Sequence, residues 1–366
     1  VGSEMCIRDS TDDELYPLVT NLGGHDLRAL LDAYRRCDAE ADRPSVVFAY
    51  TVKGWGLPIA GDPLNHAALL SGDQIDALRA EFGLSLADEW NRFADGTAES
   101  ELCVSTGSEL NNVAPSARPS PPIPDATGVL ASTPVSTQET FGRVLTSLGN
   151  IEAVAARMVT TSPDVSVSTN LGGWINKMGV FTAEDRPDYL GSDRLLRWEQ
   201  GTTGQHVELG ISEMNMFLAL HAFGLGHELH GQHLLPIGTV YDPFVCRGLD
   251  ALIYALYNGA RFVVAGTPAG VTLAPEGGAH QSSITPSIGL ELPGLTYAEP
   301  AYARALDWLL CNGLRRLGEP DGDSLYVRLS TRPVDQAPFS TAEERLGRSR
   351  IGADVLAGAY RLVEPA

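Results

Sequence analysis

One stretch decides how this chain folds: His206-Val207-Glu208-Leu209, followed at once by Gly210-Ile211-Ser212-Glu213-Met214-Asn215-Met216-Phe217. The first four residues predict a short strand, and the apolar spacing from Ser212 to Phe223 predicts a helix directly after a glycine turn. A strand that turns straight into a helix is typical of a parallel sheet covered by helices. The same junction places one carboxylate, Glu213, in the first turn of the helix among methionines and an aromatic side chain.

The pattern repeats on both sides of this stretch. A helix is predicted from Ser136, whose hydroxyl can cap it, through Leu148. Further strands are predicted at Arg157 to Thr161, Leu234 to Val240, Arg261 to Ala265 and Ser324 to Leu329, and further helices at Pro243 to Tyr257 and Ala301 to Leu317. Alternating strands and helices indicate an α/β fold with a parallel sheet.

The residues before this region predict a second helix-and-strand unit. Apolar side chains at helical spacing occupy Asp26 to Ala39, and the β-branched and aromatic run Ser45 to Val52 predicts a strand that ends at Lys53-Gly54-Trp55-Gly56. A loop, Leu57 to Asn65, then leads to His66, and a helix is predicted near Gly72 to Phe82. A long loop after a strand is a candidate for function.

Composition shifts divide the chain into five parts. Residues 1–10 fit no later pattern and are interpreted as a translated adapter, so Cys6 is set aside with them. Residues 11–105 form one α/β part, and 106–135, rich in Pro, Ser, Ala and Asn, is predicted to be a linker. Residues 136–340 form a complete domain, and 341–366 is predicted to begin a truncated C-terminal domain.

Charge and cysteine usage exclude several function classes. The chain has 366 residues, 46 acidic and 26 basic, and a formal charge of −20. That charge opposes binding to nucleic acid or to an anionic membrane surface. The five cysteines are far apart with no C-x-x-C pair, and no stretch reaches the roughly 18 apolar residues of a spanning helix. We therefore expect a cytoplasmic protein without disulfides.

Two more segments carry aromatic or titratable side chains to the expected ends of strands. Thr239-Val240-Tyr241-Asp242-Pro243-Phe244 spaces two aromatics three apart, and Ala274-Pro275-Glu276-Gly277-Gly278-Ala279-His280-Gln281 presents one histidine on a Gly-rich turn. Ligands bind at this edge of parallel sheets. Taken singly, each segment has an ordinary explanation: Glu213 satisfies a helix dipole, the aromatics are core residues, and the loop histidine is solvated.

Together, in this order and spacing, the three segments resemble the pyrimidine-binding domain of thiamine diphosphate enzymes. The resemblance is closest to the homodimeric first (decarboxylating) component of the pyruvate dehydrogenase complex. It runs from about Thr11 to Pro338, and it includes Tyr297 to Ala303 (Y-x-E-P-A-Y-A) and Thr51 to Gly56. It implies a complete pyrimidine-type domain preceded by the tail of a diphosphate-type domain.

The resemblance also implies roles for individual residues. The glutamate matching Glu213 hydrogen-bonds the aminopyrimidine ring and drives it to the imino tautomer, with the cofactor as electron sink. The aromatic matching Phe244 stacks on the pyrimidine, and the one matching Tyr241 lies beside it. His280 would face the reacting centre, and Glu276 would border the site. The remaining match, His66, corresponds to a mobile-loop histidine that helps to pass the acyl group to the lipoyl arm of a partner.

By the same resemblance, the function is oxidative decarboxylation of a 2-oxo acid, pyruvate first, with acyl transfer to a lipoyl-bearing acyltransferase component. The family builds its sites at a subunit interface, which implies a homodimer. Magnesium and the diphosphate are held in the family by Gly-Asp-Gly and a later Asn, because the anionic tail needs a hard cation. Nothing before Ser45 matches this motif, and no metal ligand is assigned within the chain.

Several features depart from the family or leave other functions open. The run Ser168-Thr169-Asn170-Leu171 stands where relatives commonly carry an acidic residue, and Gln281-Ser282-Ser283 is closer to the transketolase pattern. One alternative is therefore two-carbon ketol transfer, although 276–291 offers no basic side chain for a sugar phosphate. A second alternative is a non-catalytic interaction protein that retains the fold.

The histidine-rich segment 221–233 contains side chains of the types that bind metal ions. It holds His221, His227, His230 and His233, with Glu228. Its spacings lack the i and i+4 pairing of zincins, so a surface or helix-end role is favoured. Lys177 is likewise interpreted as solvated rather than as a clamp for substrate charge.

Overall fold

The computed structural model describes residues 11, 13–15, 22–111, 120–129, 133–184, 187 and 196–365. The chain divides into two compact units, Val1–Thr106 and Gly107–Ala366. The proposed adapter, residues 1–10, lies outside the described residues. Within the described part of the chain, no helix is long and apolar enough to cross a membrane.

The first unit contains the helices that its sequence predicts. Helix α3 (Leu27–Ala39) begins at Asp26, whose carboxylate accepts a hydrogen bond from the Ala29 N–H. Helix α4 (Gly72–Glu81) begins at a capping box of Ser71 and Gln74, in which each side chain satisfies the other residue's N–H. Both predicted helices are therefore confirmed. Helix α5 (Ala98–Asn111) follows.

The predicted strand at Ser45 to Val52 is wrong. These residues are not in a strand, and Phe48 and Tyr50 are 85% and 78% exposed. Their backbone contacts include single hydrogen bonds from the Gly24 N–H to the Tyr50 carbonyl and from the Val52 N–H to Nε2 of His25. A strand needs a ladder of hydrogen bonds to a neighbour, and the described residues of the first unit hold no strand that could supply it.

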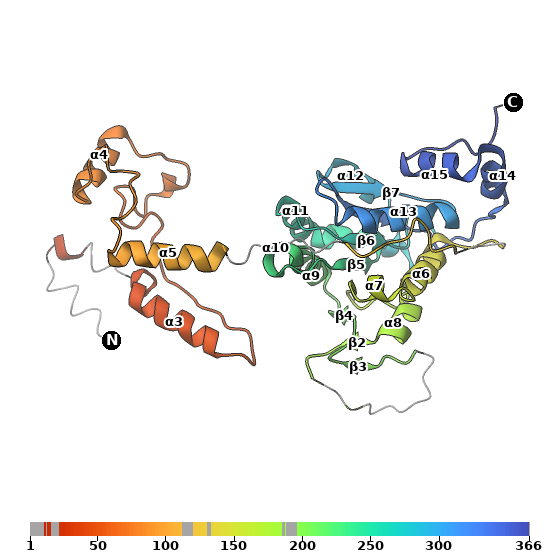
Figure 1. The fold of residues 1–366 in the computed structure, drawn as a ribbon, viewed down its shortest axis with the longest axis horizontal. Helices are drawn as coiled ribbons and strands as arrows, with labels where there is room; N and C mark the ends of the chain where they lie inside the picture. The colour runs from red at the N-terminus through yellow and green to blue at the C-terminus, as the bar shows by residue number, and fades with distance from the viewer. Residues whose placement is uncertain are drawn as a thin grey trace. The chain divides into compact units, whose positions relative to one another are not determined.

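The second unit is built on an eight-stranded sheet in the order β3-β2-β4-β1-β5-β6-β8-β7, with every described pair parallel (Figure 1). Its strands are β1 (Met158–Ser162), β2 (Val180–Phe181), β3 (Gln200–Gly201), β4 (His206–Glu208), β5 (Leu235–Val240), β6 (Val263–Gly266), β7 (Leu295–Ala298) and β8 (Ser324–Arg328). The predicted parallel α/β fold is confirmed, and all five predicted strands of this unit are present. The short strands β2, β3 and β7 were not predicted from the sequence.

Helices cover both faces of this sheet, and the strands divide their side chains between them. Val263 and Ala265 face one core cluster, which contains residues of α6, α8 and α13. Val264, between them, faces a second cluster with residues of α9 and α11. This alternation is the period of two that a pleated strand imposes. The helices are α6 (Thr137–Leu148), α7 (Glu152–Ala155), α8 (Gly172–Met178), α9 (Glu213–Gly224), α10 (Gly226–His230), α11 (Leu249–Tyr257), α12 (Thr285–Glu291) and α13 (Ala303–Arg316).

The described part of the predicted linker, residues 120–129, packs on the second unit. The N–H groups of Thr127 and Gly128 donate to the buried carboxylate of Asp307 on α13, at 2.9 and 3.1 Å. Ile123 is buried in the core cluster beside α13. These polar anchors hold a segment that has few large apolar side chains of its own.

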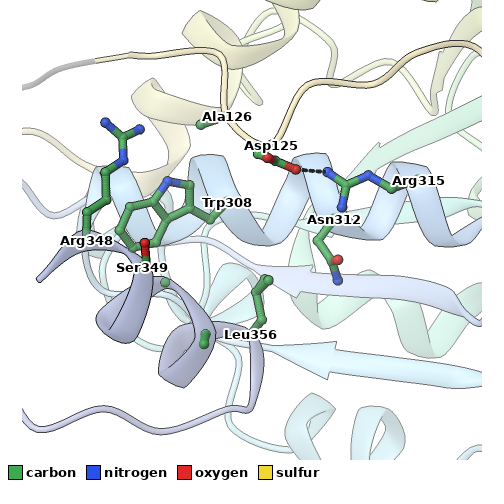
Figure 2. Close-up of a pocket in the computed structure, with 10 residues that line it drawn as sticks. Asp125, Ala126, Trp308, Asn312, Arg315, Arg348, Ser349 and Leu356 are labelled. Carbon is green, nitrogen blue, oxygen red and sulfur yellow. Dashed lines mark hydrogen bonds and ion pairs between the residues drawn. The ribbon is translucent and has the colours of Figure 1, made fainter.

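Two C-terminal helices, α14 (Ala337–Leu346) and α15 (Arg348–Leu356), pack on α13 around Trp308 and Phe339. Figure 2 shows the cavity that remains between α13, α15 and residues 125–126, with a volume of about 470 Å³. At one end of this cavity, Arg315 donates to the Asp125 carboxylate at 2.8 Å. The start of the predicted C-terminal part is therefore packed against the sheet domain.

Candidate active site

The candidate site lies at the carboxyl edge of two adjacent parallel strands. Strand β5 ends at Val240, and a 3₁₀ segment, η3 (Asp242–Gly248), follows directly. Strand β6 pairs with β5 and ends at Gly266, before the loop that contains η4 (Ala274–Glu276) and η5 (Gly278–His280). Because parallel strands end at the same edge, these segments can meet.

Three rings gather there. The Tyr241 and Phe244 ring centroids are 6.1 Å apart, and His280 lies 5.2 Å from the first and 5.4 Å from the second. The Tyr241 ring meets His280 edge to face at 82°, a favoured aromatic arrangement. The structure thus brings together three of the residues that the sequence analysis singled out.

Glu213 joins this group through an arginine. It is 7% exposed, in the first turn of α9, which Ser212 caps by accepting from the Asn215 N–H. Arg247 on η3 places Nη1 3.3 Å from Glu213 Oε1. The Cζ atom of Arg247 lies 3.7 Å from the centroid of the Phe244 ring, which is a cation–π contact. Arg247 therefore neutralises the carboxylate and covers one face of Phe244, and the sequence analysis did not identify it.

The other site side chains are held by hydrogen bonds. The Tyr241 hydroxyl donates to Ser168 Oγ at 2.8 Å. Nδ1 of His280 donates to the Glu276 backbone carbonyl at 2.9 Å, which leaves Nε2 free of that bond. Glu276 is exposed beside the histidine. Its backbone therefore orients His280, and the role predicted for its side chain at the border of the site stays a prediction.

His66 belongs to the first unit. It ends the 3₁₀ turn η2 (Pro63–His66), and its Nδ1 lies 2.7 Å from the ammonium nitrogen of Lys53, which donates to it. Asn65 holds the same loop by donating to the carbonyls of Lys53 and Ile59. His66 and the three rings belong to different compact units, and the role predicted for His66 at the site stays a prediction.

A buried polar network lies directly behind the aromatic group. Asp242 is completely buried and accepts from Arg328 Nε at 3.0 Å and from Thr285 Oγ1 at 2.6 Å. The hydroxyls of Ser282 and Tyr326 also donate to it. Burial raises the pKa of Tyr326, and the Asp242 charge raises it further, so the phenol remains a donor.

This network ties together four segments that follow or end strands. Burial alone would lower the pKa of Arg328, but its bonding to Tyr297 and Asp242 raises the pKa above the usual range. Arg328 also reaches Glu299 at 2.8 Å. Ser282 is only two residues from His280, so Asp242 fixes the histidine loop against the segment that carries the aromatics. The only sequence signal for this network was a lone arginine at the end of an apolar strand.

The described residues contain no group of three or more His, Cys, Asp or Glu side chains placed to hold a metal ion. The sequence assigned no magnesium ligand within the chain, and the magnesium expected from the family resemblance stays a prediction.

Comparison with known proteins identifies the domain. Residues 123–331 match the family described as "Pyruvate dehydrogenase E1 component middle domain". The chain belongs to this family. Among relatives, the pyruvate dehydrogenase E1 component of Cupriavidus necator is 25% identical over 343 residues, which are 87% of this chain and 38% of that protein. The corresponding protein of Escherichia coli K12 is 22% identical over 89% of this chain and 39% of its own length.

The chain therefore spans about two fifths of the length of these relatives. Among solved structures, transketolase from Leishmania mexicana matches with a TM-score of 0.60 and 16% identity, covering 85% of this chain and 45% of that one. Transketolase from Campylobacter jejuni matches with a TM-score of 0.59, also at 16% identity, covering 85% of this chain and 46% of its own. These structures support the fold of the pyruvate dehydrogenase E1 middle domain, which the transketolases share.

Proposed function

We propose that this chain supplies the pyrimidine-binding half of a thiamine diphosphate site that decarboxylates a 2-oxo acid, pyruvate first. The observation that carries the proposal is the grouping of Glu213, Tyr241, Phe244 and His280 at one edge of the sheet. Membership in the pyruvate dehydrogenase E1 middle domain family supports pyruvate as the substrate.

The residues present fit the ring half of the cofactor. Glu213 is buried, and Oε1 is its atom paired with Arg247, so a carboxylate oxygen is available to hydrogen-bond a ring nitrogen. The tilted rings of Tyr241 and Phe244 offer aromatic faces of the kind on which a flat heterocycle packs. When bound, thiamine diphosphate would supply the electron sink for loss of carbon dioxide from the 2-oxo acid.

Each side chain has a task that follows from its contacts. Glu213 presents its second carboxylate oxygen to the ring nitrogen, in a position from which solvent is largely excluded. Phe244 orients the flat ring, and Tyr241 is locked beside it by Ser168. Nδ1 of His280 is held by the Glu276 carbonyl, so Nε2 is the atom left to meet the substrate. His66 would assist acyl transfer from the loop of the first unit.

Partners follow from the same proposal. Helices α9 and α11 pack together and expose Leu218, Ile253, Tyr254 and Tyr257, which are 42% to 84% exposed. An exposed apolar group of this kind is typical of a protein interface. We infer a homodimer that uses this surface and a lipoyl-bearing acyltransferase as the acyl acceptor, with magnesium bound by residues outside the matched motifs. The four described cysteines are free thiols, which supports a reducing, cytoplasmic setting.

The test begins at the gene. The genomic DNA upstream of the Thr11 codon is sequenced, and the whole reading frame is expressed. Pyruvate-dependent release of carbon dioxide is then measured with thiamine diphosphate and magnesium. We expect Glu213→Gln to lower the rate by about a hundredfold or more, the range of a lost acid–base group. Glu344→Gln, on the exposed surface of α14, is the matched control and should leave the rate unchanged.

Three results would contradict the proposal. Equal rates for wild type and Glu213→Gln would remove the carboxylate from the chemistry. Ketol transfer between sugar phosphates without decarboxylation would favour the transketolase alternative. The third result is a start codon directly upstream of the Thr11 codon, with neither cofactor binding nor activity when a separately encoded diphosphate-binding subunit is added. This result would favour a non-catalytic interaction protein.

A further inference from the structure

A second polar cavity lies at the opposite edge of the same sheet. His233, Arg157 and Arg261 come just before β5, β1 and β6, so all three lie where neighbouring parallel strands begin. The cavity has a volume of about 280 Å³, and its lining includes His227, Glu228, His233, Arg261 and Gly318. The candidate active site uses the carboxyl ends of these strands, so the two sites are separate.

Two imidazole nitrogens in this cavity have no hydrogen-bond partner among the described residues. They are Nδ1 of His227 and Nε2 of His233, and both are buried atoms. His233 is only 9% exposed, and its ring centroid lies 6.3 Å from that of His227, with the planes at 85°. Buried polar atoms are nearly always hydrogen-bonded in folded proteins, so two in one cavity point to a polar occupant.

Gly318 packs closely against His233 and Ser120 in the wall of this cavity. A Cβ atom added at Gly318 would lie 3.2 Å from Nε2 of His233 and would overlap the Ser120 hydroxyl. Arg261 holds this turn in place by donating to the carbonyls of Leu317, Glu319 and Pro320. The wall of the cavity is therefore fixed by a charged side chain rather than by loose packing.

The charges around His233 favour an anion over a metal cation. The pKa of His233 is lowered, first by burial and then by the positive charges of His227, Arg157 and Arg261. Glu228 opposes this effect, and it is the smallest of the contributions. A cation would meet this positive field, whereas an anion would be attracted by it. Such a field is unusual in a chain of formal charge −20.

We propose that this cavity binds a small oxyanion, the phosphate or carboxylate group of a small molecule, between the side chains of His227 and His233. Each imidazole donates one N–H to the anion, and Arg157 and Arg261 supply long-range positive charge while they keep their present hydrogen bonds. The carboxylate of Glu228 also lines the cavity and repels negative charge, so the site favours an anion of low charge.

The test follows the imidazole C2–H resonances of the chain by NMR during titration with inorganic phosphate and, separately, with acetate. We expect saturable shifts of the His227 and His233 signals, assigned from the variants. Saturation by phosphate alone would identify a phosphate group, and saturation by acetate would identify a carboxylate. His227→Gln and His233→Gln should each weaken binding by about tenfold or more, the value of a lost charge-assisted hydrogen bond. His230→Gln, on the same helix but exposed and away from the cavity lining, is the matched control and should bind as wild type.

Other outcomes would overturn the proposal. If the His227 and His233 signals do not shift at the highest phosphate and acetate concentrations, no oxyanion binds there. Tight binding of Zn²⁺ that depends on both histidines would replace the anion site with a metal site. Because His233 is buried, His233→Gln is first checked for native circular dichroism, and His227→Gln, at a half-buried position, decides the matter if that variant does not fold.

Discussion

The strongest stability prediction concerns Asp242, the buried acceptor behind the candidate active site. Asp242→Asn keeps the size of the side chain but removes its charge. Arg328, whose side chain is 4% exposed, would then retain only the partly exposed Glu299 as a charged partner. The amide group would also turn an N–H₂ toward hydroxyls that now donate to the carboxylate.

The expected magnitude follows from the burial. Removing one member of a buried ion pair costs about 3–5 kcal/mol, because the other charge is left uncompensated. The remaining contact of Arg328 with Glu299 places this case near 3 kcal/mol, or more than about a hundredfold in the unfolding equilibrium. The matched control is Asp354→Asn, which breaks the exposed pair with Arg350 and should cost below about 1 kcal/mol.

The assay is hydrogen exchange in increasing urea, read by mass spectrometry on peptides from β6 and β8. These peptides report the second unit alone, so the first unit does not confuse the transition. A double variant, Asp242→Asn with Arg328→Met, should be less destabilised than the sum of its single changes, because no buried charge remains unpaired. Equal destabilisation by Asp242→Asn and Asp354→Asn would refute the reasoning.

Three further predictions follow from single contacts. Burial alone would raise the pKa of Glu208, but hydrogen bonds, first that of His206, lower it below 4.5. The stability that the ionised Glu208 contributes is therefore present above pH 4.5 and is lost as the pH falls through the lowered pKa. Glu208→Gln should be less stable than wild type in a urea titration at pH 7, and the difference should vanish in acid. Burial raises the pKa of Cys311, so it should resist iodoacetamide while exposed Cys103 reacts; equal labelling, read by mass spectrometry, would contradict this. Phe141→Ala should cost about 3–5 kcal/mol in the exchange assay because the ring is fully buried; a cost below about 1 kcal/mol would contradict its place in the core.

Local patterns predicted the helices and the central strands because their signals are contained within each segment. The predicted cap Ser136 does cap its helix, and the helix predicted from Asp26 begins there, with the Asp26 carboxylate as its cap. Ser45 to Val52 has equally good strand residues, but strand formation depends on a neighbour, which a local pattern does not report. Strand β7 was missed because it lies at the edge of the sheet, where only Leu295 is buried, so its sequence lacks the apolar run of the central strands; pairing with β8 forms it.

The candidate site was predictable where its residues recur in order along the chain, and not where they meet across it. Glu213, Tyr241, Phe244 and His280 were found from motif order, and the rings among them do meet. The bond between Asp242 and Arg328 joins residues 86 positions apart, and no spacing rule anticipates it.

The two edges of the sheet differ in how their polar groups are satisfied. At the carboxyl edge, Oε1 of Glu213 pairs with Arg247 and Nδ1 of His280 bonds to the Glu276 carbonyl, so each side chain is oriented by one contact and keeps its other polar atom for a ligand. At the amino edge, the imidazole nitrogens of His227 and His233 have no partner among the described residues, so an anion adds contacts without breaking any. Selectivity at the first edge therefore rests on a ligand that can bond the remaining oxygen of Glu213, since a ligand without a matching donor leaves that buried oxygen unsatisfied.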